Sequence, residues 1–265
     1  MADAKKPAAA IEPWQVLDSK YSYRDRWLAV RSDTVRVPNG TILSPYHTIE
    51  FPEWVCAIAL TPQREIVLIE EYRHGVELLS FELPCGTPEH EGEDVLEATR
   101  RELLEETGYG SEEWHSLGSS TANTARQNNR VHAFLALDAH KLSDQKLDPG
   151  EMIRTHVIPW DRFVADLAEG RLEIPGLHLA ALWQLRTFAK KTRDPRLLAL
   201  DAHKVSDQKL DPGEMIRTHV VPLQKFVDDL ADGRLEIPGL HLAALWQLRT
   251  FAKKTRDPRL LALAL

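Results

Sequence analysis

Cysteine and methionine are scarce in this chain of 265 residues, which contains two cysteines and three methionines. The two cysteines, Cys56 and Cys85, are too few for the disulfide framework of a small secreted domain. We therefore expect a reducing compartment, with the cytoplasm as the default localisation.

Long apolar segments are also absent. No stretch approaches the roughly 18 uninterrupted apolar residues that indicate a transmembrane helix. The opening residues, MADAKKPAAAIEP, contain two lysines but no apolar segment of signal-peptide length. We expect this opening to be a frayed leader, and we expect no membrane partner.

Positive charge is in deficit, with 33 lysines and arginines against 40 acidic residues and a formal net charge of -7. This balance gives no electrostatic footprint for nucleic acid or for an anionic membrane. A metal ion and a small anionic molecule are better matched partners. The composition, 43% hydrophobic and 28% charged, is that of an ordinary globular protein large enough for a substantial core.

The segment 86–109, GTPEHEGEDVLEATRRELLEETGY, concentrates the side chains that carry chemistry. Glu93 and Asp94 suit the positive end of a helix dipole. Gly108 favours a helix end, because glycine readily adopts left-handed backbone conformations. We therefore predict a helix of roughly four turns that ends at Gly108.

Three glutamates share one side of this predicted helix. At about 100° per residue, Glu102, Glu105 and Glu106 fall within an arc of about 100°. Like charges this close raise one another's pKa unless a cation offsets them. A hard, oxygen-preferring ion such as Mg²⁺ or Mn²⁺ would do so.

A simpler interpretation of the same residues is a solvated helix face with salt bridges. Glu97 and Arg101 are spaced i,i+4, as are Arg101 and Glu105, and charged runs usually face water. The wider pattern favours the metal-binding interpretation.

That wider pattern resembles the Nudix box, the signature of the Nudix hydrolase family. The matching positions are Gly86, Glu93, Arg101, Glu102, Leu103, Glu105, Glu106, Gly108 and Tyr109. Six residues separate Gly86 from Glu93 where the family usually has five, and a loop tolerates such an insertion. The resemblance in motif and element order extends over about residues 50 to 192.

The expected fold class is α/β (α+β), a Nudix α/β/α sandwich with a mixed sheet, beside a small N-terminal antiparallel sheet. Residues 1–50 form the leader and this small sheet, residues 51–197 the Nudix domain, and residues 198–265 a duplicate of its tail. Alternating or apolar runs predict strands at 15–21, 27–37, 41–50, 55–60, 65–71, 114–119, 131–137 and 152–158. Helices are predicted at 160–169 and 177–191.

The N-terminal sheet resembles the one that builds a dimer interface in relatives that split ADP-ribose and nucleotide sugars. The resemblance therefore implies a homodimer. The alternative is a β extension without a partner.

The resemblance also implies roles for individual residues. Arg73 and Glu82 are the expected substrate-binding residues, and the backbone carbonyl of Cys85 is an expected metal ligand. For Arg73, a solvated strand end is the competing interpretation. Glu102, Glu105 and Glu106 complete the metal site, and Glu105 is also a candidate to act on the attacking water. Arg101 is expected to orient these carboxylates through an ion pair with Glu93.

A loop ahead of the strand predicted at 152–158 supplies the general base in relatives. Asp148 and Glu151 are the acidic residues in position, and Glu151 is preferred because the residues after it match the following strand. An ordinary solvated loop carboxylate is the competing interpretation. His156 is interpreted as a hydrogen-bonded structural histidine.

Residues 135–197 recur as residues 198–260 with seven substitutions. The second copy has no Nudix box of its own, so it cannot be a second active site. The two copies present the same apolar faces to one place on the sheet, and the first has the shorter link. We predict that deletion of residues 198–265 leaves hydrolysis intact, and a sequence artefact is the alternative origin of the repeat.

The expected activity is metal-dependent hydrolysis of a nucleoside diphosphate derivative, either a nucleotide sugar such as GDP-mannose or ADP-ribose, to a nucleoside monophosphate and a sugar phosphate. ADP-ribose-preferring relatives often carry a proline in the loop after the box, and none stands between residues 119 and 130. The alternative is a nucleotide-sensing module that cleaves nothing. Such modules tend to lose motif glutamates, which are all present here.

Overall fold

The computed structural model describes residues 12–201 together with residues 239 and 244. The described residues form two compact units. The first contains the residues up to 52 and the short segment 124–128, and the second contains residues 53–123 and those from 129 onward. No helix in the described part of the chain is long and apolar enough to cross a membrane.

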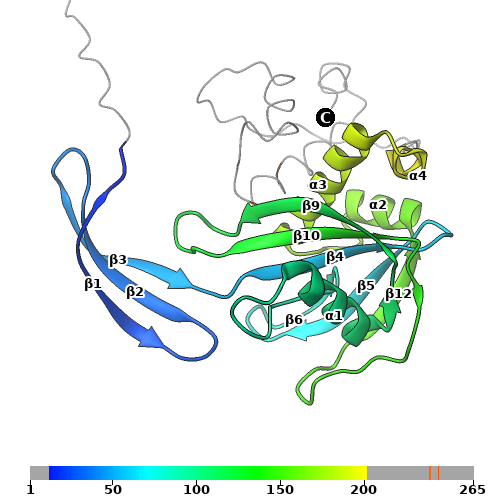
Figure 1. Ribbon diagram of the computed structural model, residues 1–265, viewed down its shortest axis with the longest axis horizontal. Helices are drawn as coiled ribbons and strands as arrows, with labels where there is room; N and C mark the ends of the chain where they lie inside the picture. The colour runs from blue at the N-terminus through cyan, green and yellow to red at the C-terminus, as the bar shows by residue number, and fades with distance from the viewer. Residues whose placement is uncertain (1–11, 202–238, 240–243, 245–265) are drawn as a thin grey trace, which may run out of the picture. The chain divides into compact units, whose positions relative to one another are not determined.

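The first unit contains an antiparallel sheet with the strand order β1-β2-β3 (Figure 1). Its strands are β1 (Gln15–Arg24), β2 (Ala29–Arg36) and β3 (Ile42–Glu50). The strand predicted from residue 27 begins two residues later, because the Asp25 carboxylate accepts hydrogen bonds from the backbone N–H groups of Trp27 and Leu28 in a turn. The predicted small N-terminal antiparallel sheet is confirmed.

The second unit is built on a mixed sheet with the order β12-β5-β4-β10-β9, in which β4 and β10 run parallel. β6 pairs with β5, and β7 pairs with β4. The strands are β4 (Trp54–Leu60), β5 (Glu65–Arg73), β6 (Leu78–Glu82), β7 (Cys85–Gly86), β9 (Glu113–Thr121), β10 (Arg130–Leu137) and β12 (Arg154–Pro159). The short strands β8 (Tyr109–Gly110) and β11 (His140–Lys141) pair with each other.

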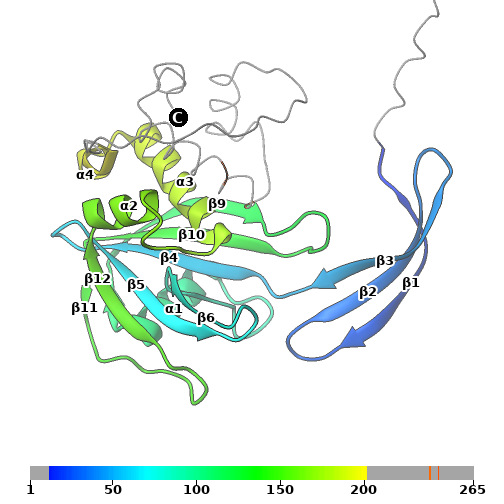
Figure 2. The same cartoon turned by 180° about the vertical axis from the view of Figure 1, so that it is seen from behind.

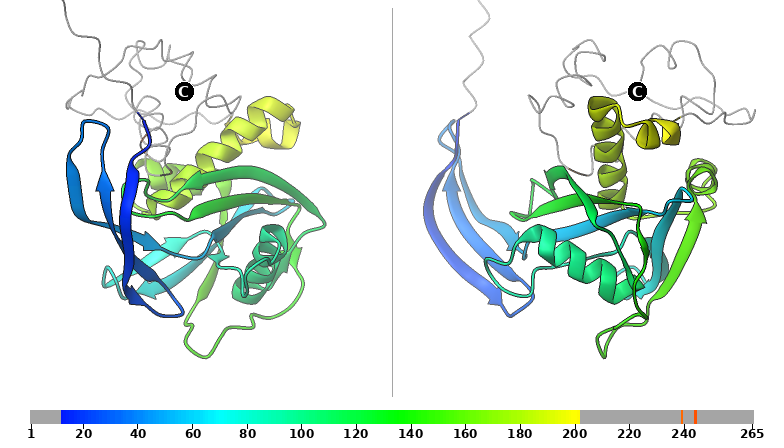
Figure 3. Two further views of the ribbon diagram at one scale, coloured as in Figure 1. Left: turned by 60° about the vertical axis from the view of Figure 1, so that its left-hand side comes forward. Right: turned by 45° about the vertical axis from the view of Figure 1, so that its right-hand side comes forward.

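Helices cover both faces of this sheet, as Figures 2 and 3 show. α1 (Val95–Thr107) lies on one face, where its Leu103 packs against Ala57 and Ala59 of β4. α2 (Trp160–Ala168) and α3 (Gly176–Thr192) lie on the other face and pack against Ile58. Successive strand residues point to opposite faces, so β4 serves both cores. The predicted α/β/α sandwich with a mixed sheet is confirmed.

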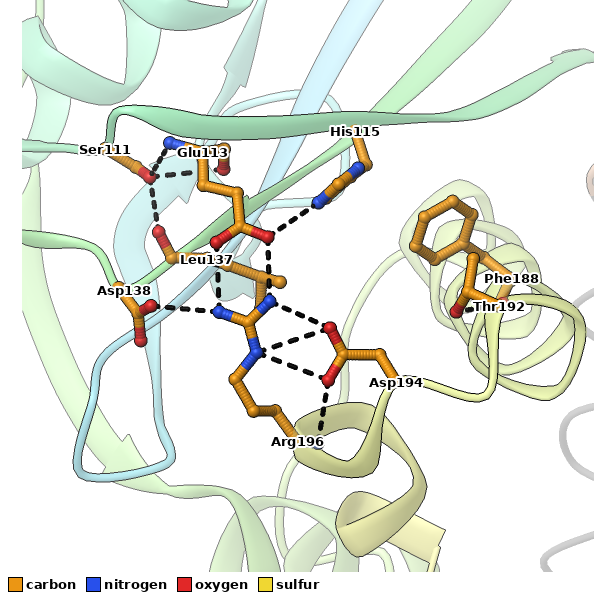
Figure 4. A network of polar contacts seen from close by, with 9 residues as sticks. All are labelled: Ser111, Glu113, His115, Leu137, Asp138, Phe188, Thr192, Asp194 and Arg196. Atoms are coloured by element: carbon orange, nitrogen blue, oxygen red, sulfur yellow. Dashed lines mark hydrogen bonds and ion pairs between the residues drawn. The ribbon is translucent and has the colours of Figure 1, made fainter.

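Ion pairs of one arginine join the chain after α3 to the sheet (Figure 4). Arg196 lies in α4 (Pro195–Leu198), a short helix that was not predicted. Its guanidinium lies 2.7 Å from Glu113 at the start of β9 and 3.0 Å from Asp138 after β10. Asp194, the N-cap of α4, lies 2.8 Å from the same group.

The turn η1 (Ala199–Asp201) continues this attachment. The carbonyl oxygen of Ala199 accepts a hydrogen bond from Arg64 at 2.9 Å, and that of Leu200 accepts one from the Trp160 indole at 3.1 Å. The first residues of the second repeat copy therefore belong to the fold of the second unit. Apart from residues 198–201, 239 and 244, that copy lies outside the described residues.

Two strands near the predicted site differ from their predicted bounds. The strand predicted at 65–71 continues to Arg73, which pairs with Leu78 of β6. β6 was not predicted, because Leu78 and Leu79 are both exposed and give no alternating pattern. The strand predicted at 152–158 begins at Arg154, because the N–H of Glu151 donates to the Asp148 carbonyl in a turn.

Candidate active site

Helix α1 holds the three glutamates in place through local structure at both of its ends. At the N-terminus the Asp94 carboxylate caps the helix by accepting hydrogen bonds from the N–H groups of Leu96 and Glu97. At the C-terminus Gly108 has a left-handed backbone with φ of 69°, as predicted from its residue type. Buried Ala98 and Leu103 fix the rotation of the helix against the sheet.

Glu106 is the most deeply buried of the three glutamates, with 4% of its surface exposed. Its carboxylate accepts a hydrogen bond from the Cys85 backbone N–H at 2.9 Å. Burial raises the pKa of Glu106 to about 9, and the negative charges of Glu102, Glu71 and Glu151 add to this rise. A carboxylate in such a place requires a compensating cation to be ionised at neutral pH.

Glu102 lies beside the backbone of Gly86. A Cβ atom at residue 86 would collide with the Glu102 carboxylate, so glycine there leaves room for this carboxylate in its present position. Burial raises the pKa of Glu102 to about 7, although Arg101 acts in the opposite direction. A second carboxyl group, only 14% exposed, thus lies beside the glycine at the start of the motif.

Arg101 links the remaining carboxylates of the motif. Its guanidinium lies 3.0 Å from Glu102 and 3.2 Å from Glu105, and its Nε lies 3.5 Å from Glu93. It also donates to the Thr87 carbonyl at 3.0 Å. The structure therefore brings Arg101 and Glu93 together, as expected.

The interpretation of this helix side as a solvated charged face is not supported. Arg101 and Glu105 do form the i,i+4 pair, but Glu97 pairs with Arg100 at 2.9 Å. Glu106 is buried, and the side chains of Arg101 and Glu102 are 22% and 14% exposed. Glu102 and Glu106 are instead largely withdrawn from solvent, whereas Glu105 is partly exposed.

The residues present fit a divalent cation. Carboxylate and carbonyl oxygens are the ligands that Mg²⁺ and Mn²⁺ prefer. Glu106 is buried and Glu102 largely so, and the raised pKa values of both carboxyls show that their charged forms are disfavoured, even with Arg101 beside Glu102. Glu105, which is partly exposed, lies one turn from Arg101 at the border of this group.

Arg73 and Glu82, both predicted to bind substrate, form an ion pair with each other. The Arg73 guanidinium donates to both oxygens of Glu82 at 2.8 Å and 2.7 Å, and it lies 2.6 Å from Glu71. Glu82 is buried, whereas the Arg73 side chain is 42% exposed. Arg73 can therefore present its outer N–H groups to an anion while Glu82 fixes its orientation.

A cavity of about 490 Å³ lies beside this pair in the second unit. Arg73, Glu82 and Gly86 form polar parts of its wall. Apolar side chains complete the wall, and they include Trp54, Val131 and Leu177. Such a cavity can hold part of a small molecule whose charged portion lies against Arg73.

The loop before β12 places Glu151 near the buried glutamates. Glu151 is exposed, and its carboxylate accepts a hydrogen bond from the Asp148 N–H at 2.9 Å. Its charge contributes to the raised pKa values of Glu102, Glu106 and Glu71. The negative charge of Glu151 thus acts on this group of carboxyls.

His156 has a structural environment. Its Nε2 lies 2.9 Å from Glu70, and its ring packs on Phe81 with the centroids 5.0 Å apart. This agrees with its interpretation as a hydrogen-bonded histidine of a strand.

Two residues of the site were not predicted from the sequence. Glu71, at the end of β5, has a pKa raised first by burial, with Glu82 and Glu151 adding to the rise. His178, in the first turn of α3, accepts a hydrogen bond from the Leu83 N–H at 3.1 Å. Glu71 stands next to Tyr72 and Arg73, which was an available signal, whereas no local pattern marked His178.

Comparisons with known protein families match both units. Residues 51–175 match the family described as NUDIX domain. Residues 14–49 match the family described as nucleoside diphosphate sugar hydrolase N-terminal domain.

Several characterised proteins are similar to the chain. It is 28% identical over 159 residues to a methanol dehydrogenase activator of Bacillus methanolicus, a match that spans 60% of this chain and 85% of the relative. It is 29% identical over 122 residues to an ADP-ribose pyrophosphatase of Bacillus subtilis, covering 46% of this chain and 65% of that protein. An ADP-ribose pyrophosphatase of Mycobacterium tuberculosis is 27% identical over 127 residues, covering 48% of this chain and 61% of that protein. The chain thus spans less than two thirds of either pyrophosphatase.

A solved structure described as an ADP compounds hydrolase has a similar fold. The match has a TM-score of 0.61 and 23% sequence identity, and it covers 70% of this chain and 98% of that one. This likeness supports the fold.

Proposed function

The chain belongs to the Nudix hydrolase family, and from this we propose that it hydrolyses the pyrophosphate bond of a nucleoside diphosphate derivative, releasing a nucleoside monophosphate and a sugar phosphate. The observation that carries the proposal is the group of buried glutamates, Glu102 and Glu106, beside the Cys85 backbone. A diphosphate repels nucleophiles through its negative oxygens, so its cleavage needs concentrated positive charge. A site of buried carboxylates with raised pKa values is suited to gather that charge as metal ions.

The proposed substrate is a nucleotide sugar such as GDP-mannose, or ADP-ribose. The match of residues 14–49 to a nucleoside diphosphate sugar hydrolase domain supports the first class, and the similarity to two ADP-ribose pyrophosphatases supports the second. The absence of a proline between residues 119 and 130 argues against ADP-ribose as the principal substrate. A cavity beside Arg73 is compatible with either class.

Glu102, Glu105, Glu106 and the Cys85 carbonyl would hold Mg²⁺ or Mn²⁺. When bound, such an ion neutralises charge on the diphosphate and lowers the pKa of water. The Cys85 N–H keeps one oxygen of Glu106 fixed, and Arg101 orients Glu102 and Glu105.

Two further side chains act on the reactants. Arg73 contacts the diphosphate in this proposal, and its bonds to both oxygens of Glu82 support the role by fixing its orientation. Glu151 accepts the proton from the attacking water as the new bond from oxygen to phosphorus forms and the anhydride bond breaks.

The alternative function is a Nudix-fold module that binds a nucleotide without cleaving it. The complete set of motif glutamates favours the enzyme. The test is phosphate release, coupled to a phosphatase, from ADP-ribose, GDP-mannose and UDP-glucose with Mg²⁺ present or chelated. Turnover of at least one substrate, lost on chelation, is expected, and binding without turnover of any of them would establish the module instead.

We also propose a cytoplasmic homodimer with the N-terminal sheet at its interface. Exposed aromatic side chains on and around β1 support this proposal, because a second copy would cover them; they are Trp14, Tyr21, Tyr23 and Trp27. Light scattering should give about twice the chain's mass, and a monomeric mass at all accessible concentrations would contradict the proposal.

A further inference from the structure

His178 connects helix α3 to the backbone beside the metal site. It is 6% exposed, and its Nδ1 accepts a hydrogen bond from the Leu83 N–H at 3.1 Å. Burial lowers the pKa of His178 to about 4, with Glu82 opposing and Arg73 adding to this shift. The imidazole is therefore neutral near pH 7, with its proton on Nε2 and its Nδ1 lone pair available to Leu83.

Three consecutive residues that lead from β6 into β7 each make a hydrogen bond outside the β4–β7 pairing, in which Cys85 is the partner of Cys56. Leu83 donates to His178, the Pro84 carbonyl accepts from the Ala57 N–H at 2.9 Å, and Cys85 donates to Glu106 at 2.9 Å. The bond between Leu83 and His178 joins residues 95 positions apart. His178 belongs to α3, which lies on the opposite face of the sheet from α1. The path of this segment decides where the Cys85 N–H and carbonyl point.

Loss of the acceptor at residue 178 would leave a buried N–H without a partner. Leu83 is fully buried, so water cannot replace the imidazole without a rearrangement. The segment would relieve this cost by moving, and Cys85 would then lose its alignment with Glu106. We propose that His178 is a positioning residue that aligns Cys85 with Glu106 in the metal site, an inference that rests on the proposed function.

A direct metal-binding role for His178 is less consistent with its surroundings. Polar atoms of Glu82, Cys85 and His178 lie within 4.8 Å of one another, an arrangement that can mark a metal site. The Arg73 guanidinium, however, bonds both oxygens of Glu82 and lies 3.9 Å from the Cys85 sulfur. A permanent positive charge already compensates this cluster, so a second cation would be repelled.

The test compares substitutions at residue 178 that keep or remove an acceptor at the Nδ1 position. His178→Asn keeps one near that position, His178→Gln moves it toward the position of Nε2, and His178→Leu removes it. The repeat supplies a matched control, because residues 234–263 are identical to residues 171–200 and His241 is the counterpart of His178. His241→Leu therefore makes the same change in the same local sequence.

The primary measurement is the Mg²⁺ dissociation constant of the full chain by titration calorimetry without substrate, with circular dichroism as a check of folding. The leucine and glutamine variants at residue 178 should bind Mg²⁺ about 10- to 100-fold more weakly, and the asparagine variant within roughly threefold of wild type. His241→Leu should bind as wild type does. The hydrolysis rate of the glutamine variant should be closer to the wild-type rate when Mg²⁺ is saturating than when Mg²⁺ is limiting.

A folded leucine or glutamine variant with wild-type Mg²⁺ affinity would overturn the proposal. So would an asparagine variant as weak as the glutamine one, since the acceptor position would then not matter. If the leucine variant does not fold, the asparagine and glutamine pair decides. A wild-type protein that binds Mg²⁺ but cleaves no nucleotide would defeat the proposed function, while the affinity comparison would still test the role of His178.

Discussion

At the scale of single residues, the proposed chemistry depends on two carboxyls that are largely withdrawn from solvent. Glu102 and Glu106 have pKa values raised to about 7 and about 9, mainly because burial disfavours their charged forms. These carboxyls have a pKa of 4.5 in the unfolded chain. Because their pKa is higher in the folded state, their contribution to stability is fully present at pH values below 4.5 and is lost as pH rises through the folded-state pKa. His178 acts in the opposite sense, because its pKa is lowered in the folded state from 6.5 to about 4. Its contribution to stability is therefore lost as pH falls through this range.

The metal-free protein should therefore lose stability as pH rises from about 6.5 to about 9. Mg²⁺ should restore it, since a bound cation favours the ionised carboxylates, and should stabilise by about 2.7 kcal/mol at 100 times its Kd. Scanning calorimetry with Mg²⁺ or a chelator should show a larger Mg²⁺-dependent rise in Tm at pH 8.5 than at pH 6. An equal rise at both pH values would contradict this prediction.

The residues of the site differ in how far the sequence can reveal them. Glu102, Glu105 and Glu106 share one helical turn, so periodicity alone groups them, and Gly86 and Arg101 follow from the motif. His178 becomes relevant through Leu83, 95 positions earlier, and no local pattern contains that pairing. The ion pair between Arg73 and Glu82 likewise depends on the pairing of β5 with β6, a strand that the sequence did not predict.

At the scale of elements, the proposed site depends on the Glu102 carboxylate of α1 lying beside Gly86 of β7. Gly86→Ala would place a methyl group against the Glu102 carboxylate, which must then move. Activity should fall by about 10- to 100-fold, as it does when the surroundings of metal ligands are disturbed. Gly75→Ala is a suitable control, because a Cβ at residue 75 meets open space, and steady-state kinetics of both variants would test the prediction.

Wild-type kinetics in Gly86→Ala would mean that the Glu102 carboxylate can move without consequence, and would contradict the importance given to its position. A drop of similar size in Gly75→Ala would point instead to a general effect of alanine in this region.

Most strands and helices were predicted within two residues, because apolar periodicity is local. β6 and α4 were missed, since exposed Leu78 and Leu79 break the pattern of one and long-range ion pairs of Arg196 hold the other.

At the scale of the whole molecule, the repeat raises the question of which copy completes the second unit. In the structure the first copy supplies β12, α2 and α3, and the attachment continues through the carbonyls of Ala199 and Leu200. The deletion predicted to begin at residue 198 would remove these contacts. A truncation that keeps them must therefore end after Asp201. The sequence could not reveal this, because the bonds of Arg64 and Trp160 join distant segments.

A chain that ends at Asp201 should keep the full rate of hydrolysis, because the motif and one complete tail remain. Its kcat and KM for the preferred substrate should lie within about twofold of the full chain, since every residue proposed to hold the metal, the substrate or the attacking water is retained. A soluble but inactive truncation would mean that the second copy serves the site, and Glu214, the counterpart of Glu151, would be the first residue to substitute.

The most direct test of the central claim is the hydrolysis rate of Glu106→Gln compared with wild type across a Mg²⁺ titration. Glutamine keeps the size of the side chain and can still accept from the Cys85 N–H, so the substitution removes mainly the negative charge. The account predicts a rate lower by about 100-fold or more at any Mg²⁺ concentration, with a weaker Mg²⁺ response. An undiminished rate with an unchanged Mg²⁺ requirement would contradict it.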